Sequence, residues 1–167
     1  LVPGVVVEHL VGGAGDLHHR SPGVVDRPAV WWCEVDRPAV VLGSRQHESL
    51  LDVDRCAAEG IEIVRRRSGG GLVLLIPDEF VWVDLLVPPG AVIEGADPDD
   101  PRALMMAAGR WWRTALVHLG DTTQLAVHEG GMVTTPWSDL ICFAGLGPGE
   151  IVDEGEKLVG LSQRRGR

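Results

Sequence analysis

Arg65-Arg66-Arg67-Ser68-Gly69-Gly70-Gly71 places three fixed positive charges directly before three residues that have no side chain. Guanidinium groups bind phosphate or carboxylate oxygens in pairs, and glycine lets the main chain approach a ligand closely. The run is therefore typical of a loop that holds a phosphorylated ligand against the backbone. Short glycine patterns also form ordinary turns beside solvated charges, so a second motif is needed to choose between these interpretations.

The second motif is the stretch 156–165, Glu-Lys-Leu-Val-Gly-Leu-Ser-Gln-Arg-Arg, which follows a turn at Glu154-Gly155. Its alternation predicts a strand with Lys157 on one face and Gly160 on the other. A glycine inside a strand leaves a gap, and it marks a place where a ligand or another backbone comes close. Lys157 alone would still be compatible with an ordinary surface lysine.

Together the two motifs resemble the lipoate-protein ligases of the biotin and lipoate protein ligase superfamily. In that family Arg-Arg-x-Ser-Gly-Gly-Gly on one hairpin faces a Lys-x-x-Gly-x-x-Gln-Arg-Arg strand. The matching residues here are Arg65, Arg66, Ser68, Gly69, Gly70, Gly71, Lys157, Gly160, Gln163, Arg164 and Arg165. The stretch from Pro38 to Gln46 is also similar to the family's strand and turn before its first helix. The resemblance covers roughly Ala29 to Arg165.

The order of several strands, a helix and a final hairpin predicts an α+β fold, with a mixed or antiparallel sheet packed by helices. With 167 residues the chain fits one domain, residues 1–167, which the resemblance makes a biotin/lipoate-ligase-like catalytic domain. Residues 1–28 are rich in turn residues and predict no definite element. In the family further strands usually follow Arg165, so we expect the C-terminal part of the fold to be missing or supplied by another chain.

Individual elements are predicted from local patterns. Two β-branched and aromatic runs, 30–35 and 39–42, flank Asp36-Arg37-Pro38 and predict a hairpin. Strands are expected at 61–66, 72–76 and 80–87, the last two apolar enough to be central in a sheet.

Two helices are also predicted. A short one should run from a cap at Asp52 through Glu59 and end at Gly60. The longest should begin at Asp100-Pro101 and end at Gly120. Its apolar stripe, expected to pack on the sheet, consists of Leu104, Ala108, Trp111, Ala115 and Leu119.

Composition excludes several classes of protein. The formal charge of -9 argues against duplex nucleic acid as a partner, since such binding depends on a positive surface. No apolar run is long enough to span a bilayer, so no membrane association is expected and the cytoplasm is the predicted location. Cys33, Cys56 and Cys142 are widely spaced and predict neither a disulfide framework nor a metal site. The pair His18-His19 is interpreted as surface residues.

The resemblance implies a two-step activity. Lipoate or octanoate attacks ATP to give an acyl-adenylate, and a lysine of an acceptor domain or a glycine cleavage H-type protein then attacks that anhydride. Negative charge develops in both steps, and a preorganised ammonium stabilises it, a role assigned to Lys157 with Gly160 giving clearance. Magnesium is expected with ATP, but no protein ligands for it can be picked out. The residues expected to bind substrate or adenylate are Arg65, Arg66, Ser68, Gly69, Gly70, Gly71, Gly160, Ser162, Gln163 and Arg164.

One departure from the family lies beside the expected site. Where the ligases usually carry His-Asp after the glycines, this chain has Leu75-Ile76. Either the substrate differs or the missing pair was structural, and the residues do not decide between these.

Two alternatives remain open. Residues 139–143 and 148–150 look like the loop of cysteine-dependent octanoyltransferases, in which a thiolate takes octanoate from acyl carrier protein. Cys142 would then be the nucleophile beside Lys157, although a cysteine between Ile141 and Phe143 is otherwise typical of a small core residue. The other alternative is a non-catalytic member that binds an acyl group or a nucleotide. All three interpretations predict that Gly69–Gly71 and Lys157 converge on one pocket.

Overall fold

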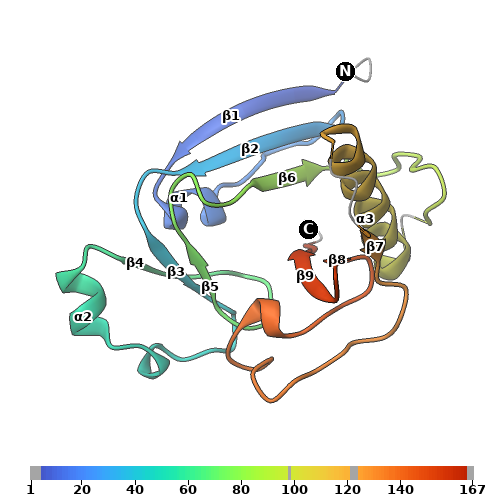
Figure 1. The fold of residues 1–167 in the computed structure, drawn as a ribbon. Coiled ribbons are helices and arrows are strands. Elements are labelled where there is room, and N and C mark those ends of the chain that lie inside the picture. The colour runs from blue at the N-terminus through green and yellow to red at the C-terminus, as the bar shows by residue number, and fades with distance from the viewer. Residues whose placement is uncertain (1–4, 98, 121–123, 165–167) are drawn as a thin grey trace. The chain divides into compact units, whose positions relative to one another are not determined.

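The structure of the protein is a computed structural model that describes residues 5–97, 99–120 and 124–164. The chain divides into two compact units, Leu1–Ala91 and Val92–Arg167, which we describe one at a time (Figure 1). The predicted single domain of residues 1–167 stays a prediction.

The first unit contains two three-stranded sheets, each with one parallel and one antiparallel pair. The first sheet has the order β1 (Val6–Gly12), β2 (Ala29–Val35), β6 (Trp82–Leu86). The second has the order β4 (Glu62–Arg65), β3 (Ala39–Leu42), β5 (Val73–Leu75).

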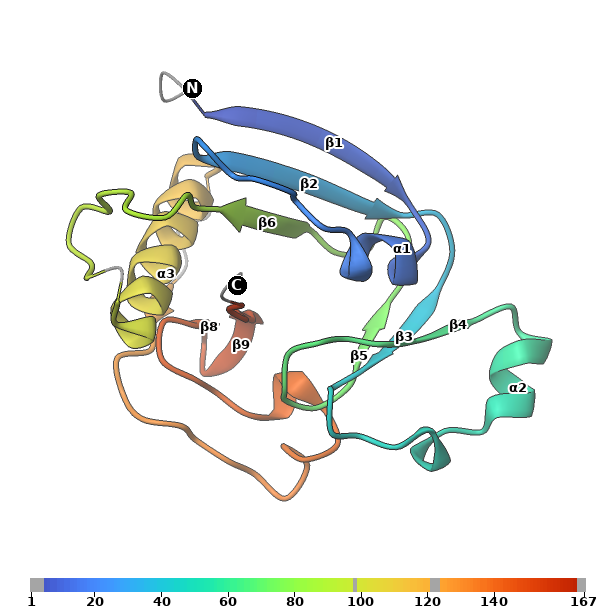
Figure 2. The same cartoon turned by 180° about the vertical axis from the view of Figure 1, so that it is seen from behind.

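Helices connect the parallel strands of this unit. Parallel neighbours need a crossover rather than a tight turn. α1 (Ala14–His19) lies between β1 and β2 in the chain, and α2 (Val53–Ala58) lies between β3 and β4 after a short 3-10 turn at Glu48–Leu50. Figure 2 shows α1 beside the ends of β1 and β2.

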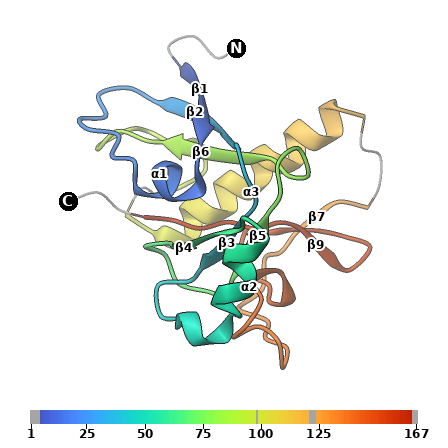
Figure 3. The same ribbon diagram turned by 90° about the vertical axis from the view of Figure 1, so that its left-hand side faces the viewer.

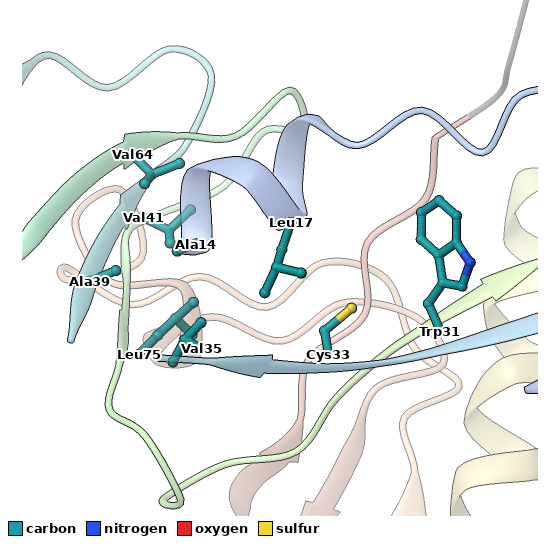
Figure 4. Packing of buried hydrophobic residues seen from close by; sticks show 9 residues of the cluster. All are labelled: Ala14, Leu17, Trp31, Cys33, Val35, Ala39, Val41, Val64 and Leu75. Atoms are coloured by element: carbon teal, nitrogen blue, oxygen red, sulfur yellow. The ribbon is translucent and has the colours of Figure 1, made fainter. Parts of the chain in front are cut away.

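The core of the first unit lies between α1 and the strands (Figure 4). On β2, buried Trp31, Cys33 and Val35 alternate with exposed Trp32 and Glu34, as the period of two requires. The buried cluster comprises Ala14, Leu17, Trp31, Cys33, Val35, Ala39, Val41, Val64 and Leu75.

The predicted hairpin of 30–35 and 39–42 is wrong, because β2 and β3 belong to different sheets. β1, which the sequence did not predict, occupies one edge of β2, and the amide of Asp36 donates to the carbonyl of Gly12 at 3.1 Å. The amide of Glu62 donates to the carbonyl of Pro38 at 2.9 Å, which starts the pairing of β3 with β4. The bend at 36–38 therefore passes the chain from one sheet to the next.

The two strands expected to be central are at edges instead. β5 and β6 are the outer strands of their three-stranded sheets, and β2 and β3 are the middle ones. All four residues of β3 are buried. The apolar content of these two stretches therefore did not distinguish a middle strand from an edge strand with one buried face.

The short helix was predicted correctly. The side chain of Asp52 accepts a hydrogen bond from the amide of Arg55 at 3.0 Å, and Gly60 follows the helix with φ +68°. A side-chain cap and a left-handed glycine at the C-terminal end are the standard stabilisers of helix ends.

The second unit contains α3 (Pro101–His118), the longest helix at 18 residues (Figure 3), and an antiparallel sheet. The sheet has the order β7 (Ala126–Val127), β8 (Ile151–Asp153), β9 (Glu156–Val159), and a 3-10 turn at Cys142–Ala144 precedes β8. The predicted start of α3 is confirmed, because Asp100 caps the amide of Arg102 at 2.8 Å and Pro101 is the first helical residue. With mixed and antiparallel sheets and few helices, the α+β prediction is confirmed.

The predicted apolar stripe of α3 is wrong in its C-terminal half. Trp111 is 46% exposed and Leu119 is 83% exposed, whereas the buried positions are Ala107 and Gly109. A side chain at Gly109 would place its Cβ 1.9 Å from the carbonyl oxygen of Gly149. The loop at Gly149 lies so close to α3 that only glycine fits at position 109. The buried face of the helix is therefore marked by small residues, which a pattern of large apolar residues does not reveal.

Among the described residues, no helix combines the length and the apolar character needed to cross a membrane.

Candidate functional site

The glycine loop, residues 68–71, is held in place by the turn that follows β3. The amide of Ser44 donates to the carbonyl of Ser68 at 2.9 Å. A Cβ on Gly43 would lie 1.9 Å from the carbonyl oxygen of Gly70, and Gly70 itself has φ +95°. Both glycines are therefore required by geometry, one for close approach and one for a left-handed backbone.

The two arginines before the loop bind main-chain carbonyls. Arg65 Nη1 donates to the carbonyl of Gln46, and Arg65 Nη2 lies 3.9 Å from Glu48 Oε1. Arg66 Nη2 donates to the carbonyl of Gly71 at 2.9 Å. The two guanidiniums go to different places, and each supports a segment of loop in this structure.

The exposure of the loop differs along its length. Gly69 and Gly70 are exposed, Ser68 is half-buried, and Gly71 is buried. Leu75, which stands where the ligases usually carry a polar residue, is buried in the core cluster. At this position the chain therefore uses an apolar side chain for packing.

A cluster of titratable groups lies against the same unit's first sheet. Burial lowers the pKa of His18 to about 4, and the charges of Arg66 and His19 act in the same direction. The His18 ring packs on Trp82 with centroids 4.3 Å apart. The interpretation of His18 as a surface residue is therefore wrong, whereas His19 is exposed as expected.

Two groups on the strands of the first sheet also favour their uncharged forms. Burial raises the pKa of the Cys33 thiol to about 12, and the Asp84 charge adds to this effect. Burial also raises the pKa of Asp84. The hydrogen bond that Trp82 Nε1 donates to Asp84 Oδ1 at 3.0 Å acts in the opposite direction but has the smaller effect. A thiol with so high a pKa is a packing residue and not a nucleophile at neutral pH.

In the second unit Lys157 is the centre of a buried polar cluster. Its side chain is only 5% exposed, and its ammonium lies 2.8 Å from Glu150 Oε1. Nζ also donates to the carbonyls of Cys142 at 3.1 Å and Gly145 at 3.2 Å. An ammonium has three donors, so these partners use its full capacity. We call Lys157, Glu150, Cys142 and Gly145 the lysine centre.

Cys142 and Gly160, both predicted as site residues, adjoin this lysine. The link between Lys157 and Cys142 is through the cysteine's main-chain oxygen. A Cβ on Gly160 would lie 3.1 Å from Lys157 Cε and 3.3 Å from Phe143 Cζ. The absence of a side chain at Gly160 thus leaves room for the lysine stem beside the Phe143 ring, whose centroid is 5.0 Å from Nζ.

The strand carrying Lys157 is shorter than predicted. β9 ends at Val159, and two residues further on the amide of Leu161 donates to the side chain of Glu150, at Oε1, over 3.1 Å. Ser162, Gln163 and Arg164 follow this end and are exposed, so their part in the site stays a prediction. Arg165 lies outside the described residues.

Glu150 is a candidate site residue that the sequence reasoning missed. It is buried, at 5% exposure, and contacts Lys157 directly. Two signals could have pointed to this pair. Lys157 is the only lysine among 15 lysine and arginine residues, and Glu150 is an isolated acid between Gly149 and the apolar start of β8.

The glycine loop and the lysine centre belong to different units. Their convergence on one pocket therefore stays a prediction. Within the described residues, no group of three or more His, Cys, Asp or Glu side chains is arranged to hold a metal ion.

Comparison with solved structures finds several related chains, among them the three that follow, and comparison with curated proteins finds no match. Two are of a candidate lipoate protein ligase from T. acidophilum. One has a TM-score of 0.60 and 18% identity, and the other, with bound lipoic acid, has 0.62 and 17%; both cover 92% of this chain and 58% of theirs. The third, lipoate-protein ligase A bound with ATP, has a TM-score of 0.62 and 17% identity. The match covers 92% of this chain and 57% of the ligase chain. These likenesses establish the fold.

This chain accordingly spans somewhat less than three fifths of the length of those solved structures. The family model described as the lipoyl protein ligase A/B catalytic domain matches residues 17–167, which is most of the sequence. The match includes both the glycine loop and the lysine centre. The chain therefore belongs to the lipoyl protein ligase A/B catalytic domain family.

Proposed function

We propose that the protein activates lipoate or octanoate with ATP and transfers the acyl group to a lysine of an acceptor domain. The observation that carries the proposal is the lysine centre, where the chain's only lysine is held as a buried, fully hydrogen-bonded ammonium beside Gly160. Lipoic acid bound to one similar protein and ATP bound to another support the choice of substrates.

The first step forms a mixed anhydride. A carboxylate oxygen of the fatty acid attacks the α-phosphorus of ATP, and the bond to the bridging oxygen breaks to release pyrophosphate. Negative charge grows on the phosphate oxygens, and a fixed ammonium such as that of Lys157 stabilises it in a partly dry site. The exposed backbone of Gly69 and Gly70 would line the path of the acyl and phosphate groups, with Arg65 or Arg66 opposing the phosphate charge.

The second step moves the acyl group. The neutral amine of the acceptor lysine attacks the anhydride carbonyl, the amine loses a proton, and AMP leaves. We expect a lipoyl domain or a glycine cleavage H-type protein as acceptor. Magnesium would accompany ATP as its counter-ion. Ser162, Gln163 and Arg164 remain proposed binding residues that act from the segment after β9, and the cytoplasm remains the expected location.

A second function is favoured by one specific contact. The hydrogen bond from Lys157 Nζ to the carbonyl of Cys142 makes these two residues neighbours. In this alternative the Cys142 thiolate attacks octanoyl-acyl carrier protein, displaces the carrier thiol and holds octanoate as a thioester before a lysine takes it. A non-catalytic member that binds an acyl group or nucleotide is the third candidate, supported by Leu75 in place of a polar residue.

Pyrophosphate release tests the main proposal. With ATP and either acid, the ligase should release pyrophosphate in proportion to acyl-adenylate, and an added acceptor domain should gain the acyl mass. A thioester seen by intact mass with octanoyl-acyl carrier protein, and lost in Cys142→Ser, would instead establish the transferase. If calorimetry shows that ATP or the acid binds, but neither pyrophosphate nor a thioester forms, the result would support the non-catalytic member.

A further inference from the structure

Glu150 is fixed from both ends of its carboxylate. Oε2 accepts a hydrogen bond from the amide of Gly147 at 2.7 Å. Oε1 accepts from the amide of Leu161 at 3.1 Å and from Lys157 Nζ at 2.8 Å. A carboxylate held by two backbone amides cannot swing away without breaking both contacts, so its position is set by the main chain.

The anchoring amides come from the two ends of the β8–β9 hairpin. Gly147 precedes β8, and Leu161 follows β9. The base of the hairpin is set in turn by α3, because the carbonyl of Gly149 occupies the place of a side chain on Gly109. Lys157 therefore meets a counter-ion that is fixed by the hairpin and by its close contact with α3.

Stability alone does not explain this pair. Both side chains are almost fully buried, at 5% and 7% exposure. Burying two charges is costly, and apolar side chains of similar size usually serve a fold equally well or better. The pair is better explained by a functional need to hold the positive charge of Lys157, the only lysine of the sequence, at a fixed position.

The other partners of Lys157 differ in kind from Glu150. The carbonyls of Cys142 and Gly145 are neutral acceptors, and both belong to the turn at Cys142–Ala144 or its end. Hydrogen bonds to ionised oxygens are shorter and stronger than those to neutral carbonyls. An anionic substrate oxygen would therefore exchange with a carbonyl and not with the carboxylate.

We propose that Glu150 is the positioning residue for Lys157. It keeps the ammonium in one place while the Cys142 and Gly145 carbonyls give way to an oxygen of the substrate. This rests on the proposed function for its catalytic part, whereas the hold on the ammonium can be measured without any substrate.

The first measurement is NMR of protein labelled with ¹⁵N-lysine. Because Lys157 is the only lysine, the spectrum contains a single side-chain Nζ signal. In the wild type its protons should exchange slowly with water, and in Glu150→Gln the signal should broaden or vanish. Glu156→Gln, which removes an exposed charge from the same hairpin, is the control and should leave the signal unchanged. A signal unaffected by Glu150→Gln would overturn the proposal.

The second measurement is the kinetics of pyrophosphate release, or of thioester formation if the transferase is the active form. Glu150→Gln should lower kcat about 10²-fold with little change in KM, since misplacing a catalytic group by about 1 Å has this effect. In a Lys157→Met background it should lower the rate no further. A purely structural Glu150 would instead reduce folded protein and leave kcat per folded molecule intact, which circular dichroism would reveal. If the wild type has neither activity, the proposed function fails, and the NMR arm still decides whether Glu150 holds the ammonium.

Discussion

The two units share one packing device. In the first, the carbonyl of Gly70 lies where a side chain on Gly43 would stand, and in the second the carbonyl of Gly149 lies where a side chain on Gly109 would stand. Each contact has a virtual Cβ-to-oxygen distance of 1.9 Å. Each one also fixes a loop that carries candidate site residues, the glycine loop in one case and Glu150 in the other.

The units differ in how they use cations. Arg65 and Arg66 are partly exposed and each donates to a main-chain carbonyl, while Arg65 also lies 3.9 Å from the exposed carboxylate of Glu48. Lys157 is buried and bound to a carboxylate. The arginine contacts support loop segments, whereas the contact with Glu150 fixes the position of the Lys157 ammonium. Removing a cation should therefore loosen a loop in the first unit, but leave an uncompensated charge in the second.

The largest expected effect follows from Lys157→Met. Loss of the ammonium leaves Glu150 buried without its counter-ion, which should lower the free energy of unfolding by about 3–5 kcal/mol. If the proposed chemistry is correct, pyrophosphate release should fall by about 10²–10³-fold per folded molecule. Urea unfolding and initial-rate assays measure the two effects. A variant with the full adenylation rate would show that Lys157 is structural.

Substitution of the two close-approach glycines should have the next largest effect. Gly43→Ala and Gly109→Ala each force a methyl against a backbone oxygen and should cost about 1–3 kcal/mol, or more where the backbone cannot move. Hydrogen exchange with mass spectrometry should show loosening confined to the unit that carries each change. Gly12→Ala and Gly131→Ala are matched controls, since a Cβ at either meets nothing within 4 Å. Equal exchange in all four variants would contradict the packing argument.

Arg66→Met should have a smaller, local effect. It removes the hydrogen bond to the carbonyl of Gly71, a contribution of about 1 kcal/mol for a partly exposed group. Amide exchange in residues 68–71 should rise, while the lysine centre stays protected. The exposed neighbour Arg67 provides the control, because Arg67→Met should change neither. Identical exchange in the two variants would mean that Arg66 does not hold the loop.

The last prediction is a pH dependence of the first unit, which develops only below pH 6.5. The pKa of His18 falls from 6.5 to about 4 on folding, so below 6.5 the unfolded chain takes up a proton that the folded chain does not. His18 thus contributes stability that is fully present above pH 6.5 and lost as the pH falls toward 4. Urea midpoints between these values should decline less steeply in His18→Gln than in the wild type.

Local chemistry was enough to predict several elements. The caps at Asp52 and Asp100 and the glycines at 60 and 120 fixed the two main helices, because helix ends are stabilised by groups close by in sequence. The motifs around Gly69–Gly71 and Lys157 likewise indicated the family, which the match over residues 17–167 confirms. The pairing of strands was not predictable in this way, since β1 and the crossover through α1 depend on contacts distant in sequence.

The sequence by itself determined the helix ends, the α+β class and the candidate cations, since propensity, capping and motif spacing act over a few residues. Only the tertiary structure decided which strands are middle strands, that Leu75 packs in the core, and that Gly109 marks the buried face of α3. It also decided that Lys157 is paired with Glu150, seven positions away in the chain. Burial and ion pairing depend on where the folded backbone brings side chains together, which capping and motif spacing do not specify.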